Sequence, residues 1–339
     1  MPRATLELVA ARAGVSRQTV SNVLNSPQLV AQETADRVRE AIEALDYRPH
    51  RAARQLRTRR SHVLGLRMPP VADGINGAVL DRFLHAVTEQ AQERGYRILL
   101  YAAPDVDELE IAQYDELLET ADLDGFVLSS TRFGDTRTTW LTEREVPFVT
   151  FGRPWGSLAA HPWVDVDGAA GVRAATEHLL ALGHRRIALL GWPDDDAVGA
   201  DRRRGWVEAM TAAGWTGDQL TGMQLLQLDS VEVAVGATRH LLAEVDPTAI
   251  VAVSDSLALG ASVALRTVDD PPAVVGFDDT PVAAAVDLSS VAQPLDEAAE
   301  HVVSLLLSRL DGDGTRPVEQ HRLLVPRLVV RGSSRPPAR

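Results

Sequence analysis

Polar side chains recur directly after short apolar runs in the second, longer part of this 339-residue chain. Carboxylates accept hydrogen bonds, guanidinium groups donate them and hydroxyls do both, so such a set facing one cleft suits a ligand rich in hydroxyl groups. A tryptophan among them could stack on a ring of such a ligand and still donate through its N–H group. The candidate ligand contacts are Asp73, Asn76, Ser129, Arg153, Asp167, Trp192, Arg202, Ser254, Asp255 and Asp278.

The competing interpretation of these residues is structural. A carboxylate after a strand can cap the next turn, which would account for Asp278, and a loop tryptophan often anchors local packing instead of binding a ligand. The acidic run at 194–196 is typical of a solvated loop, so no metal is expected there. The sequence has no phosphate-loop, dinucleotide, zinc-protease or serine-hydrolase motif, so neither an enzyme nor a bound cofactor is expected.

Short apolar strands alternate with amphipathic helices from Val63 onward, and this alternation determines where the polar residues lie. Repeated βα units predict a mostly parallel sheet covered on both faces. Two such series, before and after about residue 160, predict two doubly wound lobes with a ligand cleft beyond the carboxyl ends of the strands. The predicted strands cover 63–68, 97–102, 125–129, 147–151, 186–191, 249–253 and 273–277, and the predicted helices about 79–94, 107–120, 169–182, 202–213, 231–244, 256–266 and 295–310.

The first residues have a different pattern, with helices predicted over 5–13, 17–24 and about 33–45. Gly14 ends the first helix and Ser16 caps the second, whose outward side is polar. A helix, a glycine turn and a capped polar helix are the layout of a helix-turn-helix, although an ordinary three-helix bundle would show the same pattern.

Charge distinguishes the two parts of the chain. The net charge is −13, which by itself argues against binding to nucleic acid. Residues 1–60, however, hold 11 arginines against 6 carboxylates, a balance of +5, whereas the remainder carries −18. A basic head on an acidic body favours contact with phosphates at one end. The absence of cysteine excludes disulfides and zinc–thiolate sites, and the lack of a long apolar run or signal sequence predicts a cytoplasmic protein without membrane contact.

The sequence closely resembles the LacI/GalR family of bacterial regulators over nearly its whole length. The matching stretches, in the family's order, include TLELVAARAGVSRQTVSNVLN, RAARQL, RRRGWVEAM, AIVAVSDSLALGASVAL and VVGFDD, with weaker stretches at about 69–82 and 129–145. The resemblance implies a helix-turn-helix domain at 1–48, a hinge helix or linker at 49–61 and a two-lobed ligand-binding and dimerisation domain at 62–339. The implied fold is an all-α head plus an α/β effector domain whose two doubly wound parallel-sheet lobes are of periplasmic-binding-protein type.

The resemblance assigns the second helix to the major groove of DNA. Arg17 and Gln18 are the expected base readers, since arginine pairs bidentately with guanine and glutamine with adenine. Asn22 stands where the family usually has arginine, and it could read adenine or only contact phosphate. The residues expected at DNA are Thr5, Ser16, Arg17, Gln18, Thr19, Ser21, Asn22, Asn25, Tyr47, His50, Ala53, Arg54, Leu56 and Arg57.

The hinge match places Leu56 where the family wedges a leucine into the minor groove, which partly unstacks and bends the duplex. A plain packing residue is the alternative for Leu56. Other departures from the family pattern are His50 in place of asparagine and Ala31 in place of the Ser or Thr that caps the third helix. Gly168 replaces a frequent asparagine, and this replacement leaves a ligand contact by the neighbouring Asp167 in doubt. Arg202, Asp278 and Asp255 match the family's ligand contacts.

The implied function is that of a ligand-responsive regulator: a repressor that binds a pseudo-palindromic double-stranded operator as a homodimer and is released by a sugar-type inducer. In the implied mechanism, ligand changes the angle between the lobes and releases Leu56 from DNA. A nucleobase, nucleoside or phosphometabolite corepressor is the alternative within the class, and a transport-type binding protein of the same fold is the alternative outside it.

Overall fold

The computed structural model describes residues 4–25, 27–47, 60–68, 75, 77–104, 106–156, 161–312 and 320–337. The chain divides into two compact units, Met1–Ser61 and His62–Arg339. Several residues predicted to bind DNA or ligand lie outside the described ranges, namely His50, Ala53, Arg54, Leu56, Arg57, Asp73 and Asn76, and the side chain of Asn25 is likewise not described.

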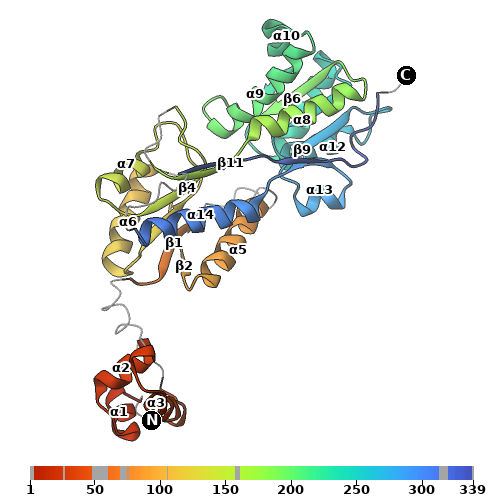
Figure 1. Cartoon of the computed structure of the whole chain (residues 1–339). Coiled ribbons are helices and arrows are strands. Elements are labelled where there is room, and N and C mark those ends of the chain that lie inside the picture. The colour runs from red at the N-terminus through yellow and green to blue at the C-terminus, as the bar shows by residue number, and fades with distance from the viewer. Residues whose placement is uncertain are drawn as a thin grey trace. The chain divides into compact units, whose positions relative to one another are not determined.

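The first unit is a small helical cluster (Figure 1). It consists of α1 (Leu6–Ala13), α2 (Arg17–Asn25), η1 (Pro27–Leu29) and α3 (Gln32–Ala44). Thr5 caps α1, and Gly14 ends it with a φ of 68°, a left-handed conformation that glycine adopts without strain. Ala31 precedes α3 without a capping side chain, as its residue type predicts. Val9, Val20 and Val38 are fully buried and form the centre of the core.

The N-terminal lobe of the second unit is built on a six-stranded, wholly parallel sheet in the order β11-β5-β4-β3-β1-β2. Two helices cover one face, where Phe83, Leu64 and Val302 share a core, and two cover the other, where Tyr114, Phe126 and Leu141 meet. The strands are β1 (Val63–Met68), β2 (Arg97–Ala102), β3 (Gly125–Leu128), β4 (Phe148–Phe151), β5 (Trp163–Val166) and β11 (His321–Leu324). The helices are α5 (Gly77–Glu93) and α14 (Leu295–Leu310) on the first face and α6 (Asp107–Thr120) and α7 (Thr136–Glu143) on the second.

The C-terminal lobe repeats this plan with the strand order β12-β10-β9-β8-β6-β7, of which β12 alone runs antiparallel. Its central strands are fully buried because helices cover both faces. The strands are β6 (Ile187–Gly191), β7 (Gln224–Leu226), β8 (Ala249–Ala252), β9 (Ala273–Phe277), β10 (Ser289–Ala292) and β12 (Arg327–Val329). The helices are α8 (Gly168–Ala181), α9 (Ala197–Ala212), α10 (Gly217–Gly222), α11 (Val231–Glu244), α12 (Asp255–Leu265) and α13 (Pro281–Ala285).

The chain passes between the lobes three times. It leaves the N-terminal lobe between β5 and α8, returns between β10 and α14, and leaves again between β11 and β12. Two of these crossovers touch, since the Asp167 amide donates to the Leu324 carbonyl at 2.8 Å. The prediction of two doubly wound lobes is therefore confirmed, and the crossovers bring the carboxyl ends of the two sheets to face one another.

Candidate functional site

A cavity of about 780 Å³ lies between the carboxyl ends of the two sheets. Both walls mix apolar and polar side chains, and charged groups are denser on the wall from the C-terminal lobe. The wall from the N-terminal lobe combines apolar and aromatic side chains with charged ones, namely Leu66, Leu80, Phe83, Phe151, Trp155, Arg67, Asp81, Arg132 and Asp165. The wall from the C-terminal lobe combines polar groups with aromatic rings, namely Asp201, Arg202, Asp229, Asp278, Gln293, Trp192 and Phe277. Apolar side chains interspersed with convergent polar groups are the usual lining of a small-molecule site.

Arg202 lines the cavity from the C-terminal lobe. It projects from α9 and is only 6% exposed. Its guanidinium donates to the Val253 carbonyl at 2.6 Å and pairs with Asp278 at 3.4 Å, while its planar face lies 3.8 Å from the Phe277 ring centroid. Its Nε atom is buried and has no hydrogen-bond partner within the described ranges. A fixed cation with an unused donor can bind an oxygen of a ligand.

Asp278 follows β9 and is held in a backbone conformation with a φ of 111°. Its carboxylate accepts from the Gln293 amide at 2.7 Å, so a residue of the second crossover is fixed to the site. Burial raises the pKa of Asp278 to about 7, although Arg202 opposes the shift. A strained, buried carboxylate that faces a cavity is a frequent feature of ligand sites.

Two tryptophans lie on opposite walls. Trp192 follows β6, and its ring centroid is 5.0 Å from the Arg202 guanidinium. Its Nε1 is buried and finds no acceptor in the described part of the chain. Trp155, from the other lobe, donates to the Thr131 hydroxyl at 3.2 Å. Trp192 thus offers the cavity a ring with an unused N–H donor, and Trp155 offers a ring whose orientation is fixed by Thr131.

Four predicted ligand contacts have structural partners, and none of the four lines the cavity. Asp167 caps α8 by accepting from the Ala170 amide at 2.9 Å. Ser254 caps α12 and donates to Asp229. Asp255 accepts from Thr280 and Ser290 behind the wall. Arg153 lies between carboxylates of the two lobes. These residues support the walls, whereas Ser129, Trp192, Arg202 and Asp278 line the cavity.

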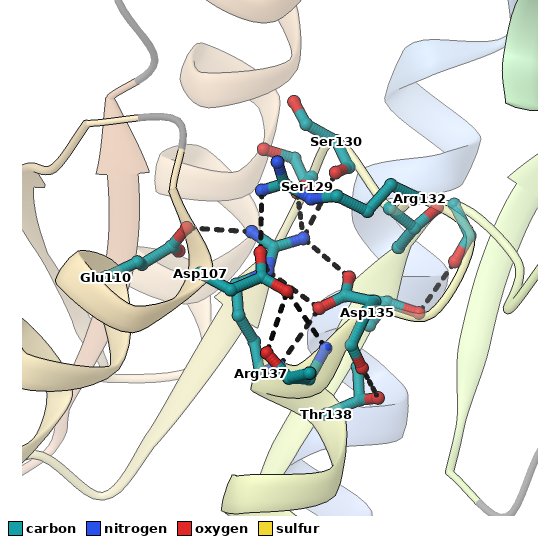
Figure 2. Close-up of polar contacts among 12 residues, drawn as sticks. Asp107, Glu110, Ser129, Ser130, Arg132, Asp135, Arg137 and Thr138 are labelled. Carbon is teal, nitrogen blue, oxygen red and sulfur yellow. Dashed lines mark hydrogen bonds and ion pairs between the residues drawn. The ribbon is translucent and has the colours of Figure 1, made fainter. Parts of the chain in front are cut away.

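A buried polar network supports the loop that carries Ser129 (Figure 2). Arg137, which is fully buried on α7, donates to Glu110 at 2.9 Å and to both carboxylate oxygens of Asp135 at 2.7 and 2.9 Å. The same guanidinium donates to the carbonyls of Ser129 and Ser130 at 3.2 and 3.1 Å. The network therefore fixes the backbone of one cavity wall from behind.

The start of α2, the predicted recognition helix, is capped and carries exposed polar side chains. Ser16 accepts from the Thr19 amide at 3.1 Å and so caps the helix. Arg17 is exposed and pairs with Glu7 at 3.0 Å, and Gln18 donates to Asn22 at 3.1 Å. Among the other predicted DNA contacts, Thr5 is the exposed cap of α1, Thr19 and Ser21 are half-buried, and Tyr47 is buried in the helical core.

Comparison with known proteins identifies the family. Residues 5–50 match the family described as bacterial regulatory proteins of the lacI family, and residues 176–334 match a periplasmic binding protein-like domain. The transcriptional regulator CelR of Thermobifida fusca is 36% identical over 98% of this chain and 98% of its own. This chain belongs to the LacI family.

Solved structures of the family share the whole architecture. A CelR–cellobiose complex superposes with a TM-score of 0.71 at 33% identity, covering 98% of this chain and 100% of that one. The lac repressor dimer bound to operator gives a TM-score of 0.82 at 25% identity, covering 98% of this chain and 99% of that one. These relatives are named as regulators of transcription and not as enzymes, in agreement with the expectation for this LacI-family regulator.

Several cavity residues of this LacI-family regulator escape the sequence analysis. Asp201 lies just before the helix predicted from 202, whereas the structure places it within α9. Asp229 follows the unpredicted strand β7, and Gln293 follows the unpredicted strand β10. Within the described ranges, no three His, Cys, Asp or Glu side chains are grouped to hold a metal ion. Among the helices that the structure describes, none is long and apolar enough to cross a membrane.

Proposed function

We propose that this LacI-family regulator is a repressor released from its operator by a neutral sugar, with a disaccharide as the first candidate. The observation that carries the proposal is a cavity whose lining interleaves aromatic and apolar side chains with fixed hydrogen-bond donors and acceptors. A sugar presents both surfaces, because its ring faces are apolar and its hydroxyls both donate and accept. The CelR structure, which is named as a cellobiose complex, supports a disaccharide and makes cellobiose the first probe.

The charge of the cavity supports a neutral ligand over a phosphorylated one. Among the described residues that line it, seven are carboxylates and three are arginines: the carboxylates are Asp81, Asp165, Asp195, Asp196, Asp201, Asp229 and Asp278, and the arginines are Arg67, Arg132 and Arg202. A phosphate would meet repulsion from most of this lining. A flat nucleobase would call for aromatic rings on both of its faces, and one face each of Phe277 and Trp192 is already covered by the guanidinium of Arg202.

The proposed mode of DNA binding uses a homodimer with one α2 helix in each half-site of a pseudo-palindromic operator. The likeness to the lac repressor dimer on its operator supports this arrangement. Arg17 and Gln18 would read base edges, with Asn22 beside Gln18. Leu56, in the predicted hinge at 49–61, would enter the minor groove between half-sites, so Leu56→Ala is expected to weaken operator binding strongly while leaving sugar affinity nearly unchanged.

Operator anisotropy at fixed salt tests the proposal. Labelled DNA from upstream of the protein's own gene is titrated with the regulator, and cellobiose and a panel of mono- and disaccharides are then added. Release by a neutral sugar is the expected result. Release or tightening by sugar phosphates or nucleobases alone would overturn the sugar assignment. Equal affinity for full and half operators would overturn the homodimer.

A further inference from the structure

Arg153 joins the two lobes beside the cavity. It follows β4 in the N-terminal lobe, and its Nε donates to Asp165 of β5 in the same lobe at 2.5 Å. Its Nη2 crosses to the C-terminal lobe and donates to Asp201 of α9 at 3.2 Å. The side chain is 19% exposed, and its two carboxylate partners are 13% and 6% exposed. Solvent screens an ion pair at this depth less than it screens one on the surface.

The partners of Arg153 are themselves cavity residues. Asp165, Asp201 and Trp155 all line the cavity, and the Arg153 guanidinium lies 4.7 Å from the Trp155 ring centroid. Trp155 is in turn bonded to Thr131 of the neighbouring loop. Arg153 therefore holds the aromatic face of one wall and a carboxylate of the other wall at the same time.

Gly168, the first residue of α8, makes this approach possible. A Cβ atom at this position would lie 2.9 Å from Arg202 Cγ and 3.1 Å from the Asp201 carboxylate, both closer than ordinary van der Waals contact. The missing side chain lets Asp201 accept from the Ala169 amide at 3.1 Å while it also pairs with Arg153. Asp201 is thus fixed at the first crossover between the lobes, next to Arg202.

We infer that Arg153 is a positioning residue for the effector. By holding the two cavity walls together through Asp201, Arg153 sets the affinity for the effector. The link between the lobes rests on the ion pairs of Arg153 with Asp165 and Asp201. The effect on affinity rests on the proposed function, because it requires a ligand in this cavity.

The chain offers a matched control for the link. Arg204 pairs with the other oxygen of the same Asp201 carboxylate at 2.6 Å, but it lies on the same helix and does not cross between lobes. Arg153→Met and Arg204→Met therefore each remove one arginine from Asp201, and only the first removes a contact between walls. Arg153→Lys keeps the charge but loses the two-sided geometry of the guanidinium, so partial rescue is expected.

The test of the link needs no ligand. Because the sequence has no cysteine, Glu143→Cys on α7 and Asp218→Cys on α10 allow spin labels to be placed on exposed positions of the two lobes. Pulsed electron–electron double resonance then measures the distribution of distances between the two spin labels, and hence between the lobes. Arg153→Met should broaden and lengthen this distribution, and Arg204→Met should leave it as in the parent chain. The same distribution in the parent and Arg153→Met would overturn the inference.

The effector test uses cellobiose as the probe. Arg153→Met should raise the cellobiose concentration for half-maximal operator release by about tenfold, the loss expected for one charge-assisted contact, and Arg204→Met by less than about twofold. If cellobiose does not release the parent chain from the operator, the proposed sugar is wrong. The distance measurement, which needs no ligand, then still tests whether Arg153 links the lobes. Equal cellobiose responses in both arginine variants would overturn the positioning role.

Discussion

Replacement of Arg137 by methionine should destabilise the N-terminal lobe by about 3–5 kcal/mol, the usual cost of removing one partner from a buried ion pair. The side chain is fully buried and makes five hydrogen bonds, to Glu110, Asp135 and the carbonyls of the 129–130 backbone. Burial alone would lower the pKa of Arg137, but the hydrogen bonds and charge of Asp135, together with Glu110, raise it above its ordinary value, so the cation is present at neutral pH. After Arg137→Met, Glu110 keeps Arg67 at 3.2 Å, whereas Asp135 loses its closest cation.

This charge balance predicts a rescue. Arg137→Met combined with Asp135→Asn should be more stable than Arg137→Met alone, because no uncompensated carboxylate is left in the interior. Asparagine can keep the capping bond that Asp135 accepts from the amide at the start of α7. The control is Arg82→Met, which removes an exposed ion pair with Asp296 in the same lobe. It should cost less than about 1 kcal/mol.

Urea unfolding followed by circular dichroism measures the free energies, and hydrogen exchange of peptides from α6 and α7 assigns the loss to this lobe. The second measurement is needed because a chain of this size need not unfold in a single step. The reasoning would be refuted if Arg137→Met were no more harmful than Arg82→Met. It would also be refuted if Asp135→Asn failed to recover stability in the Arg137→Met background.

Three further predictions concern the cavity. Arg202→Met should abolish release by cellobiose in the anisotropy assay but leave operator binding intact, whereas Arg203→Met, which changes an adjacent cation outside the cavity lining, should leave release unchanged. Gly168→Ala should weaken cellobiose binding measured by calorimetry and lower the melting temperature, because its Cβ would lie 2.9 Å from Arg202 Cγ and 3.1 Å from the Asp201 carboxylate; unchanged affinity would contradict this. Burial raises the pKa of Asp278 to about 7, so the protonated side chain contributes stability that is complete below about pH 4 and is lost as pH rises through 7. Asp278→Asn should remove this part of the pH dependence of the free energy of unfolding in urea. The same pH dependence in Asp278→Asn and the parent chain would contradict the raised pKa.

The elements whose bounds could be predicted from the sequence are helices of 14 or more residues and strands of five or six residues. The helices over 107–120, 231–244 and 295–310 and the strands over 63–68, 97–102 and 273–277 agree with the structure to the residue. The strands that escaped prediction are β5, β7, β10, β11 and β12, each of three or four residues. Strands as short as β3 and β8 were predicted because they are apolar runs, whereas each missed strand carries polar or charged residues, and SSVA of β10 looks like a loop.

The site was partly predictable because polar residues do collect at the carboxyl ends of parallel strands. Ser129, Trp192 and Asp278 follow that rule and line the cavity, whereas Arg202, which the family resemblance predicted, lies within α9, a helix that begins at Ala197 and not at the predicted residue 202. Asp167 and Ser254 follow the rule as well, but they cap the next helix, and a cap and a ligand contact look alike in sequence. Gln293 lines the cavity and donates to Asp278 but could not be predicted from the sequence, because it lies on the crossover from β10 to α14, which joins the two lobes.

The three crossovers also constrain how this protein can be made. Neither lobe is a continuous piece of chain: β5 pairs with β11 so that Trp163 lies opposite His321, and β10 pairs with β12 so that Ser290 lies opposite Val329. A ribosome that has released only the first 294 residues has therefore delivered a first sheet still lacking α14, whose Val302 and Leu306 would cover Leu64. Both lobes reach completion only once residues 295–329 have been made, so loss of this stretch would damage the two lobes together.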